Sequence, residues 1–228
     1  MTQPTETKAA RRRTQAERRA GTRESLAAAA AACLVEDGMA GFKTARVTAR
    51  AGFSEGTLFR YYANKEELIA ATMERVFLEM VAEHNGQFRD LDPADMNPAL
   101  VVESLWDLLD DQRVLSIVEV KAYARLDEKL AVAIKPVLAR QREITFDYVR
   151  SLMKGHPLTT LPIFAAATEA MVMATEAMLL SQVSVRNPAH VDALKQYFAF
   201  ILTIGFDAEL LRALVNSAQS HSGGETLT

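Results

Sequence analysis

The spacing of apolar residues along this chain favours helices throughout. No segment shows the sustained alternation of apolar and polar residues that is typical of a half-buried strand. Of the 228 residues, 37 are alanine, the strongest helix former, whereas glycine (10) and proline (7) are scarce. With 49% hydrophobic and 24% charged residues, the composition is that of a globular protein. The sequence therefore predicts an all-α fold of about nine helices.

Capping residues and helix breakers indicate where these helices begin and end. Thr14 and Glu17 have the spacing of a capping box, and Gly38 is suited to end the helix that starts there. Pro136 is expected to disturb the helix that contains it. We expect further helices at 44–51, 55–62, 65–84, 98–110, 112–125, 127–154, 161–185 and 188–216, with a loop at 85–97.

Charge is distributed unevenly between the start of the chain and the rest. Residues 1–70 contain 12 Lys and Arg against 8 Asp and Glu, a net charge of +4. Residues 71–228 contain 14 against 21, a net charge of −7. A basic head on an acidic body indicates that only the head meets a polyanion.

One cysteine and four histidines limit the redox and metal chemistry of the chain. Cys33 has no partner for an intrachain disulfide, which fits a reducing compartment, and its apolar surroundings indicate a core residue. The histidines lack metal-ligand spacing, so we expect no metal and no cofactor.

The arginine-rich start followed by the apolar run 26–35 resembles an export signal. Glu17 and Glu24 among the arginines and the lack of a clear cleavage site oppose that interpretation. No uncharged apolar stretch approaches the roughly 20 residues of a membrane span. We therefore expect a cytoplasmic protein that does not enter a membrane.

Residues 44–62 have the layout of a helix-turn-helix, with Gly52 in the turn and Ser54 as the cap of the second helix. The apolar residues are spaced to form a small three-helix core: Val47, Ala51, Phe53, Leu58 and Tyr62 with Leu26, Ala30 and Leu34. The second helix then exposes Glu55, Gly56, Thr57, Arg60 and Tyr61. Arg, Thr and Tyr side chains bond bases and phosphates, so this face is a candidate DNA-binding surface. An ordinary solvated helix face is the alternative.

The pattern T-x-E-S-L…E-D-G…A-G-F-S-E-G-T-L-F-R-Y-Y-A-N-K-E-E-L in residues 22–69 closely resembles the DNA-binding domain of the tetracycline-repressor-like (TetR) family. The resemblance covers about a fifth of the chain, and the whole length and the helical pattern also fit that family. It implies that Lys65 binds a phosphate and that six further residues contact DNA: Thr44, Ser54, Gly56, Thr57, Arg60 and Tyr61. Lys43 and Glu55 complete the predicted DNA-binding surface.

Two residues depart from the family pattern. Glu55 stands where lysine is common, and its carboxylate repels phosphate unless it accepts from a cytosine amino group or caps locally. Phe59 lacks the hydroxyl of the usual tyrosine. Affinity is then expected to depend more on Arg60, on Lys65 and on the basic arm, whose arginines 11–13 either enter a minor groove or stay solvated.

The last third of the chain is notably poor in charge. Residues 158–185 contain only Glu169 and Glu176, and residues 196–206 contain no charged residue. Helices so apolar are buried on more than one side. The resemblance implies that the last two helices form a four-helix bundle across a homodimer, and a monomeric core is the alternative. Expected interface residues are Met178, Phe198, Phe200 and Gly205.

The resemblance also implies a small-molecule cavity among the middle helices. The candidate lining residues are Phe77, Trp106, Tyr123, Phe146 and Met171. From the sequence alone these residues fit an apolar core equally well. An apolar or aromatic effector is favoured.

Together these features predict a ligand-responsive regulator of transcription, most simply a repressor, that binds a near-palindromic operator in double-stranded DNA as a homodimer. We divide the chain into a basic arm with the start of the first helix (1–20), a DNA-binding domain (21–68), a regulatory and dimerisation domain (69–217) and a polar tail (218–228).

Two alternatives remain open from the sequence. Glu55 raises the possibility of a helical ligand-binding or scaffold protein whose DNA binding has weakened. Residues 52–56 match G-x-S-x-G, the nucleophile motif of hydrolases, with Ser54 as the nucleophile. That motif requires a strand before the serine, and a cap already accounts for Ser54, so we expect no enzyme.

Overall fold

The computed structural model describes residues 14–88, 111–152 and 162–180, together with 192–193, 195–200, 209 and 213. These parts are helical, with turns between the helices and no strand, which confirms the all-α prediction. The helices are α1 (Gln15–Gly41), α2 (Thr44–Ala51), α3 (Glu55–Leu58), α4 (Lys65–Phe88), α6 (Gln112–Ala124), α7 (Glu128–Leu152) and α8 (Pro162–Leu180). The basic arm, the predicted helix at 98–110 and most of the predicted helix at 188–216 lie outside the described residues, although 192–193 and 195–200 are helical.

Helix α1 begins and breaks where the sequence predicts. The Thr14 hydroxyl accepts a hydrogen bond from the Glu17 N–H at 3.2 Å, and the Glu17 carboxylate accepts one from the Thr14 N–H at 2.7 Å. Gly38 interrupts the helix with φ 62° and ψ −176°, a conformation open to glycine, and one short turn follows it. Cys33 is fully buried, and burial raises the pKa of its thiol, which disfavours the reactive thiolate.

The second helix of the helix-turn-helix is shorter than predicted. Helix α3 ends at Leu58, and residues 59–61 continue as a turn instead of the predicted helix to Tyr62. Here Arg60 and Tyr61 donate to carbonyls three residues back, so the chain tightens before the next helix. Leu58 (0% exposed) and Tyr62 (3%) on either side of this turn are both in the core.

One other expectation about helix boundaries is wrong. Asn85 and Gly86, predicted to open a loop, lie within α4, which continues to Phe88. A glycine costs a helix only about 1 kcal/mol, less than the packing of a long buried helix contributes. Pro136 lies inside α7, which runs on as one helix, and a local disturbance there stays a prediction. Pro136 is exposed, so solvent can reach the carbonyl that lost its partner, while its neighbours Ile134 and Val137 stay in the core.

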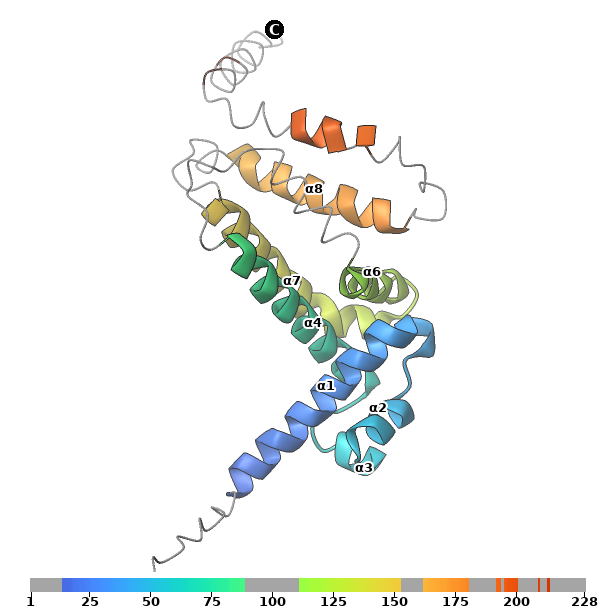
Figure 1. Ribbon diagram of the computed structural model, residues 1–228. Coiled ribbons are helices and arrows are strands. Elements are labelled where there is room, and N and C mark those ends of the chain that lie inside the picture. Colours follow the sequence, from blue (N-terminus) through green and yellow to red (C-terminus); the bar gives the residue numbers. More distant parts are fainter. Residues whose placement is uncertain are drawn as a thin grey trace, which may run out of the picture.

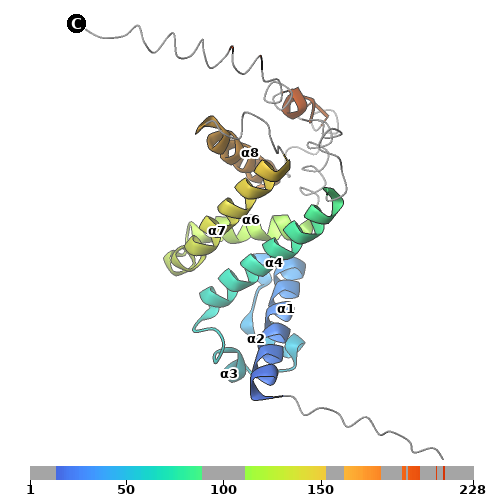
Figure 2. The same ribbon diagram turned by 90° about the vertical axis from the view of Figure 1, so that its left-hand side faces the viewer.

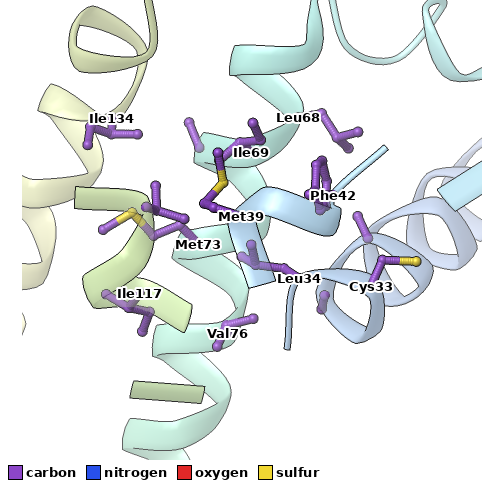
Figure 3. Packing of buried hydrophobic residues seen from close by; sticks show 14 of the residues in the cluster. Cys33, Leu34, Met39, Phe42, Leu68, Ile69, Met73, Val76, Ile117 and Ile134 are labelled. Carbon is purple, nitrogen blue, oxygen red and sulfur yellow. The ribbon is translucent and has the colours of Figure 1, made fainter. Parts of the chain in front are cut away.

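One core joins the N-terminal head, α1 to α3, to the body, α4 to α8. Leu26, Ala30 and Leu34 of α1 are fully buried, as the sequence predicts. The remaining predicted core residues also belong here: Val47, Leu58 and Tyr62 are buried, and Ala51 and Phe53 pack partly buried against them. Figure 3 shows the same cluster continuing through Leu68, Ile69, Met73 and Val76 of α4 to Ile117 of α6 and Ile134 of α7.

Helix α4 connects the two ends of the molecule. It begins beside the helix-turn-helix and runs into the body along α7, as both views show (Figures 1 and 2). Helix α8 lies at the opposite end from α2 and α3 (Figure 1). Two ion pairs hold α8 to the other helices of the body: Lys121 of α6 with Glu176, and Arg142 of α7 with Glu169 at 2.7 Å.

Among the described residues, no helix is both long enough and apolar enough to cross a membrane.

Candidate nucleic-acid interface

The turn between α2 and α3 is built by glycine and a serine cap. Gly52 adopts the left-handed conformation (φ 73°, ψ 30°), and the Phe53 N–H returns to the Thr48 carbonyl at 3.0 Å. The Ser54 hydroxyl then accepts from the Thr57 N–H at 3.2 Å and starts α3. Helix α2, not a strand, precedes Ser54, so the segment does not form the nucleophile elbow of a hydrolase.

Four of the predicted contact residues are joined by side-chain hydrogen bonds. The Thr44 hydroxyl donates to Oε1 of Glu55 at 2.7 Å, across the two helices. The hydroxyls of Ser54 and Thr57 lie 3.0 Å apart. The Glu55 carboxylate, which departs from the family pattern, is therefore held by a local partner instead of pointing freely at a phosphate.

Three cations of the predicted surface make no ion pair within the described part of the chain: Lys43, Arg60 and Lys65. Lys43 and Arg60 are exposed, and Lys65 is partly buried at the first turn of α4. Asn64 caps that helix, because its side-chain oxygen accepts from the Glu67 N–H at 2.7 Å. The Glu67 carboxylate in turn accepts from the N–H of Ala63 at 2.6 Å.

Other arginines near the head are neutralised by pairing. Arg46 of α2 lies 2.7 Å from Asp37, and Arg50 binds both carboxylate oxygens of Glu36 at 2.6 and 2.8 Å. The hydrogen bond with Arg50 holds the pKa of Glu36 below its ordinary value. These pairs attach α2 to the end of α1, so we assign them to positioning the helix-turn-helix.

Arg19 is a residue that the sequence reasoning missed. Its guanidinium lies over the Tyr61 ring, 5.9 Å from the ring centroid. The signal was present, since Arg19 is seven residues before the buried Leu26 and therefore shares its face of α1. A cation from α1 thus extends the predicted surface beside Tyr61 and the exposed Gly56.

The predicted pocket and interface residues lie far from this surface or outside the described residues. Phe77 is buried, and Phe146 and Met171 are partly buried. Tyr123 is 45% exposed, whereas Val120 and Ala124 of the same helix are buried, and its place in a ligand cavity stays a prediction. The others have these positions: Phe200 is 60% exposed, Phe198 is partly buried, and Trp106, Gly205 and the side chain of Met178 lie outside the described residues.

A short helix, a left-handed turn and a capped second helix, packed on a third helix with exposed cations, define a helix-turn-helix DNA-binding protein. The family model for bacterial regulatory proteins of the tetR family matches residues 26–72. The chain is 32% identical over 158 residues to the uncharacterized HTH-type transcriptional regulator Rv2912c of Mycobacterium tuberculosis, covering 68% of this chain and 80% of that protein. The chain belongs to the tetR family of transcriptional regulators.

Solved structures share the fold. A transcriptional regulator from Rhodococcus sp. Rha1 has a TM-score of 0.60 at 17% identity, over 81% of this chain and 97% of that chain. The multidrug binding protein EbrR in complex with ethidium has a TM-score of 0.56 at 20% identity, over 80% of this chain and 96% of that chain.

Proposed function

We propose that this regulator is a ligand-responsive repressor that binds a near-palindromic operator as a homodimer and works in the cytoplasm. One observation carries the proposal: α4 begins with Lys65 beside the helix-turn-helix and buries Phe77 and Met80 in the body. A change in the body that moves α4 therefore also moves the surface that meets DNA. We retain the division into head and body near residue 68, with α4 spanning it.

The DNA-binding face comprises the predicted residues on α2, α3 and the start of α4, with Arg19 added. Arg60 is exposed and unpaired, so its guanidinium is free to bond guanine O6 and N7. Lys65 and Lys43 bind phosphates, and Gly56 permits close approach of the backbone. Glu55, fixed by Thr44, presents an acceptor that favours a base with an amino group over a phosphate.

The outer face of α8 supports dimerisation. Five of its exposed residues follow one another at intervals of four, three, four and three, the spacing of a coiled-coil seam: Ala166, Ala170, Met173, Ala177 and Leu180. Ala165 is exposed beside them. Met173 is 64% exposed and Leu180 is 56% exposed. The two charged residues of α8, Glu169 and Glu176, pair with α7 and α6, so this outer row of α8 carries no charge. The exposed Phe200 extends the apolar surface for a second copy.

The effector is proposed to be a small molecule with an apolar or aromatic body. EbrR, which shares the fold, binds ethidium. Phe146 and Met171, on α7 and α8, are partly buried and supply apolar and polarisable contacts. To shift the DNA-binding state from 99% to 1%, the effector must prefer the non-binding state by about 5.5 kcal/mol.

Fluorescence anisotropy with the DNA upstream of the protein's own coding sequence tests the DNA-binding face. Arg60→Ala should weaken operator binding by about 1–3 kcal/mol and relax preference at one base pair. Lys65→Ala should weaken all sequences similarly and reduce the salt slope by about 0.9. Arg125→Ala, an exposed cation beyond the head, is the control and should bind like the unmodified protein. Equal weakening of operator and random DNA by Arg60→Ala would contradict its base-reading role.

Light scattering tests the dimer. Met173→Arg or Phe200→Arg should give monomers or aggregates and lose operator affinity. Leu126→Arg, at a site 92% exposed and outside the proposed dimer surface, is the control and should remain dimeric. A folded monomer at micromolar concentration for the unmodified chain contradicts the proposal. A dimer that binds small molecules but no DNA would instead favour the ligand-binding or scaffold protein.

A further inference from the structure

Two polar atoms on α7 are buried without a hydrogen-bond partner. They are the amide nitrogen Nε2 of Gln141, a residue 6% exposed, and the hydroxyl of Tyr148. Buried polar atoms in native proteins nearly always have a partner, so each unpaired atom requires an explanation. The amide nitrogen can only donate and the phenol hydroxyl can donate, so an acceptor oxygen is the one type of partner that satisfies both.

The two donors lie on the same side of α7, and Tyr148 contacts α4. Residues seven apart on a helix share a face and are separated by about 10 Å along the axis. His84 of α4 (7% exposed) places its ring 5.7 Å from the Tyr148 ring, edge-on at 66°. Thr145 between the two donors is satisfied, because its hydroxyl donates to the Gln141 carbonyl at 2.8 Å. A polar seam, defined as Gln141, Tyr148 and His84, thus interrupts the apolar contact of α4 with α7.

Burial raises the pKa of Tyr148 to about 12, so its hydroxyl stays protonated and remains a donor at physiological pH.

The arginines in the second half of α7 are all paired with carboxylates. Arg140 pairs with Glu74 at 3.3 Å, and Arg142 pairs with Glu169. Arg150 pairs with Asp147 at 3.0 Å. On α4, Arg75 pairs with Glu24 at 2.7 Å and with Glu79 at 2.8 Å. Within the described part of α4 and α7, the seam therefore has two neutral donors beside the His84 ring, and each of these arginines is already paired with a carboxylate. Burying an anion without a positive partner is costly, whereas a neutral oxygen needs only a hydrogen bond.

We propose that the effector is an uncharged, largely apolar molecule whose carbonyl- or ether-type oxygens accept hydrogen bonds from Tyr148 and Gln141. The proposal rests on the ligand-responsive function proposed above and names the chemical class of its ligand. The molecule lies along α7, where the donors are two helical turns apart, and its apolar body contacts the surrounding helices. Because α4 forms the other side of the seam, an occupant also presses on the helix that carries Lys65.

Calorimetry on the full chain tests this class with three probes of similar shape. Benzophenone carries a neutral carbonyl, diphenylmethane lacks the oxygen, and 4-benzoylbenzoate adds a negative charge. We expect benzophenone to bind at least about 5-fold more tightly than either of the others, since a net neutral hydrogen bond changes affinity by about 2- to 12-fold. Because the single carbonyl of benzophenone reaches only one of two donors so far apart, at least one of Tyr148→Phe and Gln141→Met should remove that preference, and both should leave diphenylmethane binding unchanged.

Thermal unfolding of the unliganded variants separates a ligand role from a structural one. The Tyr148 hydroxyl and Nε2 of Gln141 make no hydrogen bond that Tyr148→Phe or Gln141→Met would remove, so the thermal midpoint should stay the same or rise. Tyr197→Phe, at a tyrosine 57% exposed, is the matched control and should change neither binding nor midpoint. A lower midpoint in both seam variants would indicate a structural role and overturn the proposal.

Three further results distinguish the hypotheses. Tighter binding of 4-benzoylbenzoate, a preference for benzophenone that survives both seam variants, or no binding of any probe at 1 mM would each overturn the neutral-acceptor seam. Operator release is measured in parallel by anisotropy. Binding of benzophenone through the seam without release leaves this inference standing and refutes the ligand-responsive function instead.

Discussion

Gly38 and Glu119 lie where the head contacts the body, and replacing Gly38 with alanine should disrupt that contact. At φ 62° and ψ −176° a residue other than glycine is strained by about 1–3 kcal/mol. An added Cβ would lie 2.6 Å from Oε2 of Glu119, too close for two atoms that are not bonded, so the carboxylate must move. That oxygen accepts a hydrogen bond from the Met39 N–H at 3.0 Å, across 80 residues of chain.

The expected loss follows from these two effects. A hydrogen bond to a charged group contributes about 1.5–3 kcal/mol, and somewhat less where it is only part-buried, as here. Together with the backbone strain, Gly38→Ala should lower the free energy of unfolding by about 2–5 kcal/mol. Urea unfolding followed by circular dichroism measures it, at one fixed protein concentration because a dimer's stability depends on concentration.

Gly52→Ala is the matched control. Gly52 also has a positive φ (73°), but no atom lies within 4 Å of its added Cβ, so only about 1–2 kcal/mol should be lost. Glu119→Gln keeps an acceptor and removes the charge, and it should cost less than Gly38→Ala. In the double variant the two losses should not add, because alanine has already displaced the side chain. A Gly38→Ala loss no greater than that of Gly52→Ala, or full additivity with Glu119→Gln, would refute the reasoning.

Three further outcomes are expected. Gly21→Ala, in an exposed part of α1 with open space around the new methyl, should raise the thermal midpoint through about 0.5–1 kcal/mol of added stability, and a lower midpoint would contradict this. Leu58→Ala should cost about 2–5 kcal/mol in urea unfolding and abolish operator binding, whereas Phe59→Ala, at 45% exposure, should cost far less; equal losses would show that α3 is not anchored as described. Because the folded-state pKa of Tyr148 is raised from 10.0 to about 12, its contribution to stability is present below pH 10 and is lost as the pH rises towards 12. Urea midpoints at pH 9 and 11 should therefore differ less for Tyr148→Phe than for the unmodified protein, and an unchanged difference would show that another group titrates.

The sequence by itself determined the interactions between residues that are close neighbours along the chain. The capping box of Thr14 and Glu17, the break at Gly38 and the cap of Ser54 each depend on residues within three positions, so their types and spacing suffice. The apolar spacing of the first helix and of residues 44–62 likewise predicted the buried core of the head, including Leu26 and Leu58.

Only the tertiary structure decided how residues distant in the sequence meet. Nothing in the sequence pairs Glu119 with the N–H of Met39, since this contact depends on how α6 packs against α1. Packing likewise overrode the local signal of Gly86 inside α4 and turned Tyr123 outward. The polar seam at Tyr148 was equally invisible, because burial without a partner is a property of neighbouring helices and not of any one segment. Local propensities amount to about 1 kcal/mol per residue, and contacts gathered across the core are large enough to outweigh them.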